Sequence, residues 1–154
     1  MTLYSNVFKL NSMDKTYFGG VEVLKLIPQR SPIIQISSID ITSELTATSS
    51  LLVTKDNYFV SDGKLFEPGL IEHIAQSAAA YAGYETYIKN EDPHLGYIGE
   101  IKKCNFYGLP LVNEEITTNL EVVSKLDNIS LIKAQTFCNN KMIVECQMKI
   151  FIKM

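Results

Sequence analysis

The chain has 154 residues, 46% of them hydrophobic and 20% charged, so it can bury the core of one domain but is too short for two full domains. With 14 basic and 17 acidic side chains its net charge is -3, which provides no basic field for a nucleic acid. We expect one domain over residues 1–154, with a loosely attached N-terminal arm over residues 1–20.

The pattern of apolar and ligating residues disfavours a membrane span and a metal site. No segment approaches the roughly 18–20 uninterrupted apolar residues that cross a bilayer. Cys104, Cys138 and Cys146 form no Cys-x-x-Cys unit, and the two histidines, His73 and His94, lack the spacing of metal ligands. We expect a protein of the reducing cytoplasm that uses no metal and no cofactor.

The first predicted elements are a short helix and a pair of strands. Apolar side chains at helical spacing in Val21–Ile27 predict the helix, which Pro28 ends. β-Branched residues dominate from residue 33 to residue 53 and predict a strand, or two strands with a break near Thr42–Glu44. A further short strand is expected at Asn57–Val60.

One long helix follows. Residues 70–87 contain strong helix formers after Pro68-Gly69, with few charged side chains before Glu85. Small residues occupy most of the helix surface, so neighbouring backbone can approach closely and the helix is expected to be buried.

Four strand-like runs make up the rest of the chain, with hairpin signals at Asp127-Asn128 and Asn139-Asn140. The runs are Gly96–Tyr107, Glu115–Ser124, Ile129–Phe137 and Met142–Lys153. The last run alternates apolar with polar residues, which gives one buried and one wet face. One apolar helix with a large antiparallel sheet predicts an α+β fold in which the curved sheet wraps around the helix.

Glu72 is the side chain most suited to chemistry, because a carboxylate within an otherwise apolar helix has to be paired or stripped of water. The alternative is that Glu72 stabilises the N-terminus of the helix as a cap. Gln76 lies one turn further on and either shares a ligand face with Glu72 or serves as a core amide bonded to backbone. His73 points roughly 100° away from Glu72, which indicates a packing or interface histidine and not a dyad.

Motifs in matching order resemble those of the FabA/FabZ-type 3-hydroxyacyl-acyl-carrier-protein dehydratases. Leu26-Ile-Pro-Gln-Arg-Ser-Pro-Ile33 resembles the family's Leu-Pro-His-Arg-x-Pro-hydrophobic opening, and Ile71-Glu-His-Ile-Ala-Gln-Ser-Ala78 resembles its Glu-x-hydrophobic-Ala-Gln helix. Gly96–Phe106 is similar to the strand after that helix, and Asn113–Ile116 occupies the place of its Gly-Asp turn. The resemblance covers about residues 20–153, and the Asp62-Gly63 lead into the helix is most similar to the dehydratase-like subgroup of aryl-polyene pathways.

The resemblance implies the hotdog fold, in which a long helix is wrapped by an antiparallel sheet, and a dimer with active sites at its interface. It also implies a lyase that acts on 3-hydroxyacyl thioesters of an acyl carrier protein or coenzyme A, in fatty-acid or polyketide/polyene-type biosynthesis. The residues carried over are Glu72 and Gln29 for catalysis and Gln76, Pro68 and Gly69 for substrate binding. Lys102 and Lys103 either bind the acidic carrier or its phosphopantetheine phosphate, or are solvated on opposite faces of their strand.

Two departures from the family pattern bear on activity. Gln29 stands where the family has its catalytic histidine, and a neutral amide cannot accept the α-proton of the substrate. Pro68-Gly69 lies two residues closer to the helix acid than the family's Pro-Gly, which puts in doubt a backbone amide that polarises the thioester carbonyl.

Three functions therefore stay open. The first is a dehydratase-like subunit that is impaired alone and works as a homodimer or as a heterodimer with a histidine-bearing hotdog subunit. The second is an acyl thioesterase in which Glu72 activates water and Gln29 orients the water or the carbonyl. The third is a non-catalytic acyl-binding partner subunit.

Overall fold

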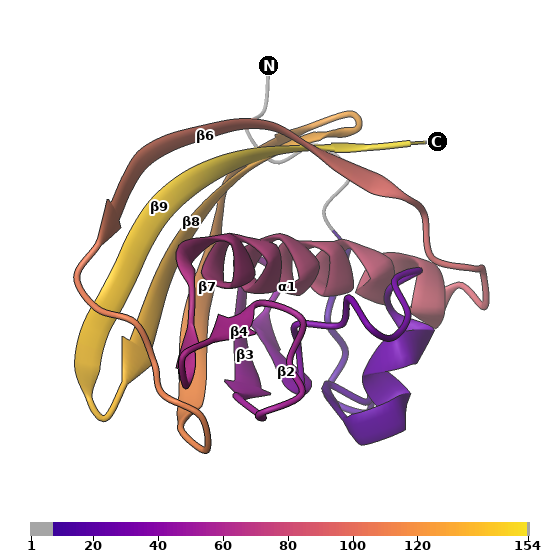
Figure 1. Ribbon diagram of the computed structural model, residues 1–154. Helices are drawn as coiled ribbons and strands as arrows, with labels where there is room; N and C mark the ends of the chain where they lie inside the picture. The colour runs from indigo at the N-terminus through magenta and orange to yellow at the C-terminus, as the bar shows by residue number, and fades with distance from the viewer. Residues whose placement is uncertain (1–7, 154) are drawn as a thin grey trace.

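The computed structural model describes residues 8–153 and shows one long helix held in the curve of one large sheet (Figure 1). In chain order the elements are β1 (Tyr17–Gly19), the 3-10 helix η1 (Gly20–Lys25), β2 (Ser38–Ser43), β3 (Thr46–Leu52), β4 (Val60–Ser61), β5 (Lys64–Leu65), α1 (Glu67–Ile88), β6 (Gly96–Phe106), β7 (Glu115–Leu126), β8 (Ile129–Cys138) and β9 (Lys141–Ile152). The predicted α+β fold is confirmed. No helix within residues 8–153 combines the length and the apolar character that a membrane span needs.

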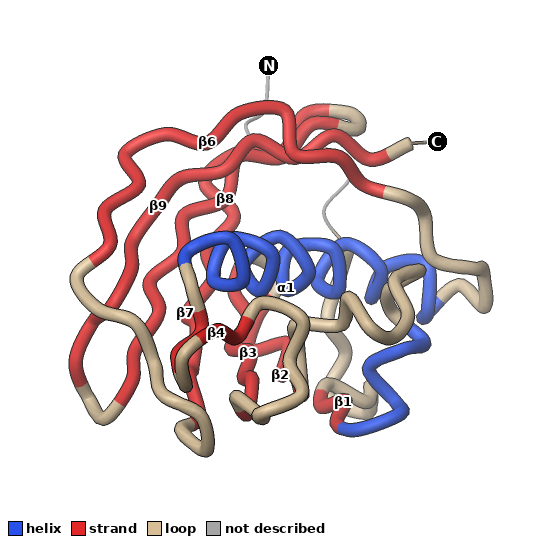
Figure 2. Tube along the Cα trace, viewed as in Figure 1, coloured by secondary structure: helices blue, strands red, loops and turns tan. Residues whose placement is uncertain are grey.

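The large sheet is antiparallel throughout. Over the described part of the chain its strand order is β1-β2-β3-β7-β8-β9-β6, and the strands curve around α1 (Figure 2). Although β6 follows the helix in sequence, it lies at the far edge of the sheet beside β9. Large apolar side chains on this edge strand are exposed, and they are Tyr97, Ile98, Ile101 and Phe106.

The predicted hairpins and the alternation of β9 are confirmed. Asn139 and Asn140, between β8 and β9, have φ of 51° and 64°, as a two-residue turn that matches the twist of its strands requires. The structure differs at Asn57–Val60, where a strand was expected. Oδ1 of Asn57 instead accepts a hydrogen bond from the backbone N–H of Phe59 at 2.8 Å, which closes a side-chain turn that leads into the β4–β5 hairpin.

The helix α1 begins three residues before the predicted start, at Glu67, because Pro68 is tolerated in a first turn whose N–H groups lack helical partners. It ends at Ile88 in a left-handed cap. Asn90 has a φ of 56° and donates to Tyr87 O at 3.0 Å, and the N–H of Glu91 donates to Thr86 O at 2.8 Å. These two bonds satisfy carbonyls that a helix end would otherwise leave unpaired.

The N-terminal segment is packed and not loosely attached over the residues that the structure describes; residues 1–7 of the expected arm lie outside them. Phe8 is 6% exposed, and its ring centroid lies 5.5 Å from that of Tyr81 and 5.2 Å from that of Tyr84. Phe18, on β1, is fully buried, and β1 itself pairs with β2. Two aromatic side chains thus anchor a segment whose polar composition suggested an arm.

Candidate active site

Glu72 lies in the second turn of α1 with a partly exposed side chain. Its Oε1 accepts a hydrogen bond of 2.9 Å from Nε2 of Gln76, one helical turn further on. Within residues 8–153 this is the one hydrogen bond that the structure gives the carboxylate. Glu72 does not cap the helix, because the N-cap residue is Phe66, which has no side-chain cap. The carboxylate is therefore held on one side and open to a water or ligand on the other.

Gln76 is fully buried, and its amide group is fully used. Its Oε1 accepts a hydrogen bond from the backbone N–H of Gln35 at 2.6 Å, while Nε2 donates to Ile33 O at 2.8 Å as well as to Glu72. An amide nitrogen has two protons to donate, and both are engaged. These are the bonds of a core amide bonded to backbone, one of the two alternatives for Gln76, and they make it a positioning residue that links Glu72 to the segment before β2. A contact of Gln76 with substrate stays a prediction.

His73 faces the core and not Glu72, as expected of a packing histidine. It is fully buried, and its ring nitrogens contact Gln35 O at 2.7 Å through Nδ1 and Thr118 Oγ1 at 2.8 Å through Nε2. Thr118 Oγ1 continues to Thr136 Oγ1 at 2.6 Å. Burial lowers the pKa of His73 to about 4, against the opposing effect of its hydrogen bond to Gln35, so the ring is neutral near pH 7. Nδ1 donates to the carbonyl, and Nε2 accepts from the threonine.

Gln35 is the residue that the sequence analysis missed. The helix side chains of Gln76 and His73 bind its backbone N–H and carbonyl, and its fully buried side chain exchanges two hydrogen bonds, of 3.0 and 2.9 Å, with the side-chain amide of Asn57. The available signal was a single polar residue inside an apolar, β-branched run. Gln35 thus ties the segment before β2 to α1 and to the loop before β4.

Gln29 lies on a loop that Arg30 braces. Nη1 of Arg30 donates to the carbonyls of Ile27 and Gln29, each at 2.7 Å, and Nη2 donates to Leu24 O at 3.2 Å. Arg30 is part of the opening motif, but its place in the sequence indicated no role for it. Oε1 of Gln29 is buried and has no hydrogen-bond partner among the described residues. The loop therefore presents an unpaired acceptor on a fixed backbone.

The loop that carries Gln29 also rests directly on the helix. A Cβ at Gly83 would lie 1.8 Å from the carbonyl oxygen of Leu26, so only glycine allows this approach. Gly83 is eleven residues beyond Glu72, or roughly 16 Å along the helix axis at 1.5 Å per residue. From that contact the chain runs back along α1 until Ile33 reaches Gln76. Gln29 thus lies on a segment that leads from the C-terminal half of the helix toward Glu72.

The Pro68-Gly69 pair has a structural role in this chain. The N–H of Gly69 donates to Phe66 O at 2.9 Å, so it is not available to polarise a thioester carbonyl. A Cβ at Gly69 would come within 2.7 Å of Phe59 Cβ, so glycine is needed for packing under the β4–β5 hairpin. Pro68 is exposed in the first turn of α1. The expected substrate contact through Gly69 does not fit this hydrogen bonding.

Lys102 and Lys103 lie on the edge strand β6, at a bulge against β9. Lys102 pairs with Glu100 at 3.7 Å, so its charge is offset by a neighbour on its own strand. Lys103 has a φ of 49° and an exposed side chain. Within residues 8–153 no three His, Cys, Asp or Glu side chains lie close enough together to hold a metal ion.

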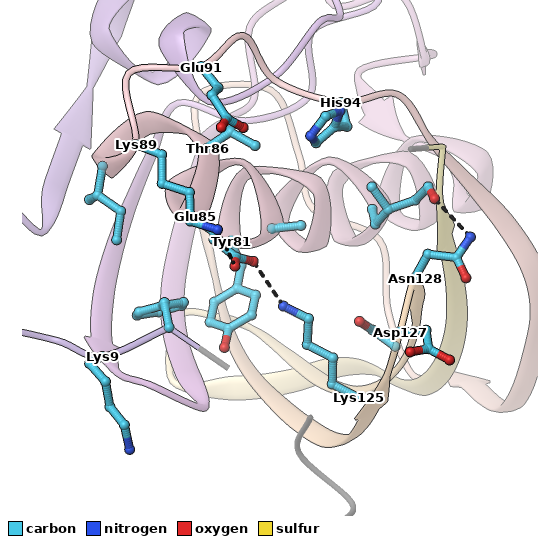
Figure 3. A pocket seen from close by; sticks show the side chains of 15 residues that line it. Lys9, Tyr81, Glu85, Thr86, Lys89, Glu91, His94, Lys125, Asp127 and Asn128 are labelled. Carbon is cyan, nitrogen blue, oxygen red and sulfur yellow. Dashed lines mark hydrogen bonds and ion pairs between the residues drawn. The ribbon is translucent and has the colours of Figure 1, made fainter. Parts of the chain in front are cut away.

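A cavity of about 730 Å³ lies at the other end of α1, between the helix, the β7–β8 turn and the end of β9 (Figure 3). Its lining includes Tyr81, Glu85, Lys89 and Lys125. Glu85 pairs with Lys89 at 3.1 Å and with Lys125 at 3.2 Å; burial by itself would raise the pKa of Glu85, but these lysines hold it below its usual value. Tyr81 is nine residues from Glu72, which is about half a turn around the helix and roughly 14 Å along it. The cavity is therefore separate from the Glu72 neighbourhood.

A long helix wrapped by a curved antiparallel sheet defines the hotdog fold. The chain superimposes on the dehydratase heterocomplex ApeI:P from Xenorhabdus doucetiae with a TM-score of 0.79 and 14% identity, covering 86% of this chain and 91% of that one. It also resembles a hypothetical thioesterase protein with coenzyme A from Streptococcus pneumoniae TIGR4, with a TM-score of 0.59 and 9% identity over 75% of this chain and 84% of the other. These likenesses confirm the hotdog fold.

A sequence model of the ApeP-like family, described as ApeP dehydratase, matches residues 21–153. The chain therefore belongs to the ApeP-like dehydratase family, as its motifs predicted. It is also 24% identical over 147 residues to the 3-hydroxyacyl-[acyl-carrier-protein] dehydratase FabZ of Enterococcus faecalis (strain ATCC 700802 / V583), covering 90% of this chain and 98% of that relative.

Proposed function

We propose that the chain is a dehydratase-like subunit that binds 3-hydroxyacyl thioesters of acyl carrier protein or coenzyme A and is impaired in dehydration on its own. One observation carries this proposal: Glu72 is retained and oriented by Gln76, while position 29 holds an amide. Dehydration needs a base that takes the α-proton and an acid that protonates the departing hydroxyl. Glu72 can supply the acid, but the neutral amide of Gln29 cannot supply the base.

We propose further that the subunit acts in a dimer, either with itself or with a second hotdog subunit that bears the missing histidine. Among residues 8–153 no strand pairs with the outer edge of β6, and this edge and its exposed apolar side chains support such pairing, because an open edge strand is a template for another chain. The relative from Xenorhabdus doucetiae is described as a heterocomplex, which supports a pair of unlike subunits. A cytoplasmic setting in fatty-acid or polyene-type biosynthesis fits three free cysteines.

Substituting histidine for Gln29 tests the impairment. We expect the purified wild-type chain to convert 3-hydroxyacyl thioesters to enoyl thioesters slowly or not at all, and Gln29→His to raise the rate about 10²–10⁴-fold, which is the usual contribution of a general base. Enoyl formation is followed by mass spectrometry over several chain lengths. A folded Gln29→His variant with no gain would show that residue 29 and Glu72 do not face one substrate, and it would contradict the proposal.

A thioesterase is the second candidate, favoured by a carboxylate that has one hydrogen bond and an open side. Glu72 would accept a proton from the attacking water while Gln29 orients that water. Release of free thiol from a saturated acyl thioester, without enoyl formation, would select this function. Binding of thioesters with neither reaction would select a non-catalytic partner subunit.

A further inference from the structure

The side-chain oxygen of Gln29 is a hydrogen-bond acceptor without a donor. Its Oε1 is buried from solvent, and no group of the described residues donates to it. Folded proteins satisfy most buried polar atoms, because an acceptor that has lost its water and gained no partner costs free energy. A donor supplied by a bound ligand would satisfy this oxygen.

The backbone of the loop that carries Gln29 is held in place. Arg30 donates to the carbonyls of Ile27 and Gln29, which flank Pro28, and to Leu24 O. The Leu26 carbonyl is seated against Gly83. Three guanidinium bonds and one close backbone contact therefore fix the loop before a ligand arrives, which lowers the ordering cost of binding.

The loop that carries this acceptor is linked to Glu72 through Ile33 and Gln76. Ile33, four residues after Gln29, is bonded to Gln76, and Gln76 also donates to Glu72. Four residues span at most about 14 Å even when fully extended. An acyl thioester with its pantetheine arm is long enough to contact both side chains.

We propose that Oε1 of Gln29 accepts a hydrogen bond from the 3-hydroxyl of the bound 3-hydroxyacyl thioester, so that Gln29 selects hydroxylated over saturated acyl chains. The inference rests on the proposed function, since it concerns that ligand. Within the acyl group the hydroxyl is the one donor, because the thioester carbonyl and sulfur offer no proton. An amide oxygen accepts this hydrogen bond without removing a proton. Gln29 would therefore bind the substrate without acting as the base in its dehydration.

Matched ligands isolate this bond. Isothermal titration compares 3-hydroxyoctanoyl-coenzyme A with octanoyl-coenzyme A, which share the pantetheine and nucleotide and differ in one hydroxyl. We expect wild type to bind the hydroxylated ligand about tenfold more tightly, the scale of one hydrogen bond that also satisfies a buried acceptor. The ratio of the two affinities should fall to about one in Gln29→Met and persist in Gln29→Glu, which keeps an acceptor. Gln135→Met, at a partly exposed position on β8, is the control and should keep the wild-type ratio.

The outcomes separate the inference from the proposed function. Equal wild-type affinities for the two ligands, or a preference that survives in Gln29→Met, overturn the role of Gln29 while leaving acyl-thioester binding in place. Failure of wild type to bind either ligand contradicts the proposed function itself, and the inference falls with it.

Discussion

Gln76 donates a hydrogen bond to Glu72 over 2.9 Å while its own amide is held by the backbone of residues 33 and 35, more than forty positions earlier in the chain. The orientation of the Glu72 carboxylate is therefore set by the segment before β2 and not by the helix alone. A substitution that breaks the bonds of Gln76 to residues 33 and 35 should therefore also change the orientation of Glu72.

Removing the amide of Gln76 should weaken both stability and function. In Gln76→Met the Gln35 N–H and the Ile33 carbonyl lose their partners inside the core. At about 1–3 kcal/mol for each buried unpaired group, we expect a loss of roughly 2–5 kcal/mol in the free energy of unfolding, measured in urea. Gln147→Met, on the partly exposed face of β9, should change this free energy by less than about 0.5 kcal/mol. Equal effects of the two substitutions would contradict the assigned role.

Glu72→Gln separates chemistry from folding. The variant keeps an oxygen that can accept from Gln76 Nε2 but loses the titrating carboxyl. We expect a nearly unchanged melting temperature, since charge near a helix N-terminus contributes only about 0.3–1 kcal/mol. Any thioester turnover should fall at least about 100-fold, the lower end of acid–base catalysis. Glu67→Gln, in the exposed first turn of α1, is the matched control. Unchanged turnover in Glu72→Gln would remove Glu72 from the mechanism.

The elements of the fold could be predicted from sequence because their signals are local. Hydrophobic alternation predicted β9, and paired asparagines predicted the turn before it. Small residues without β-branching predicted α1. The site could be predicted only in part. The sequence singled out Glu72, whose catalytic role stays a prediction, but the two functions of Gln76, ligand contact or core amide, differ only in what surrounds it.

The features that could not be predicted depend mostly on contacts between residues far apart in the chain. The clamp on Gln35 joins positions 38 and 41 residues apart, and no periodicity encodes it. Phe8 is an aromatic residue in a polar stretch, and its burial depends on Tyr81 and Tyr84 in a helix that lies far along the chain. The loss of the Gly69 amide as a donor to substrate follows from one local bond to Phe66, which depends on where the helix starts.

His73 should make stability depend on pH. Its pKa is about 4 in the folded chain, through burial, against 6.5 for an ordinary histidine. Between these values the unfolded state binds the extra proton, so stability is complete above about pH 6.5 and falls as the pH decreases toward 4, by up to roughly 3 kcal/mol at about 1.4 kcal/mol per pKa unit. Urea unfolding between pH 7 and 4.5 measures the slope. His73→Gln should flatten it, and His94→Gln, on an exposed loop, should not. An unchanged slope in His73→Gln contradicts the assignment.

Phe8 should contribute to stability as a core residue. Phe8→Ala removes ring contacts with Tyr81 and Tyr84, and we expect a loss of about 3 kcal/mol, at the lower end for a buried phenylalanine, because the segment can partly collapse. Met13→Ala, in the same segment but 89% exposed, should be nearly neutral in chemical denaturation. A neutral Phe8→Ala would restore the expectation of a loose arm.

The edge strand β6 should carry the subunit interface. Light scattering at micromolar concentration should give about twice the 17.3 kDa of the chain, or a complex of that size with a second hotdog subunit. Ile98→Lys on β6 should shift the population toward the single chain, because charged edge residues oppose strand pairing. Ile129→Lys, at the start of β8 with a similar exposure of 38%, is the control. A single species of 17.3 kDa for wild type, with or without candidate partners, contradicts this placement.

The contact of Leu26 with Gly83 separates two kinds of evolutionary change. Position 29 can exchange histidine for glutamine while the loop backbone stays in place, since Arg30 and the helix hold that backbone and not the side chain. A methyl group at position 83 would instead push the whole loop off the helix, with whatever residue stands at 29. A substitution at position 29 therefore changes only the side chain that the loop presents, whereas a side chain at position 83 would move the loop itself.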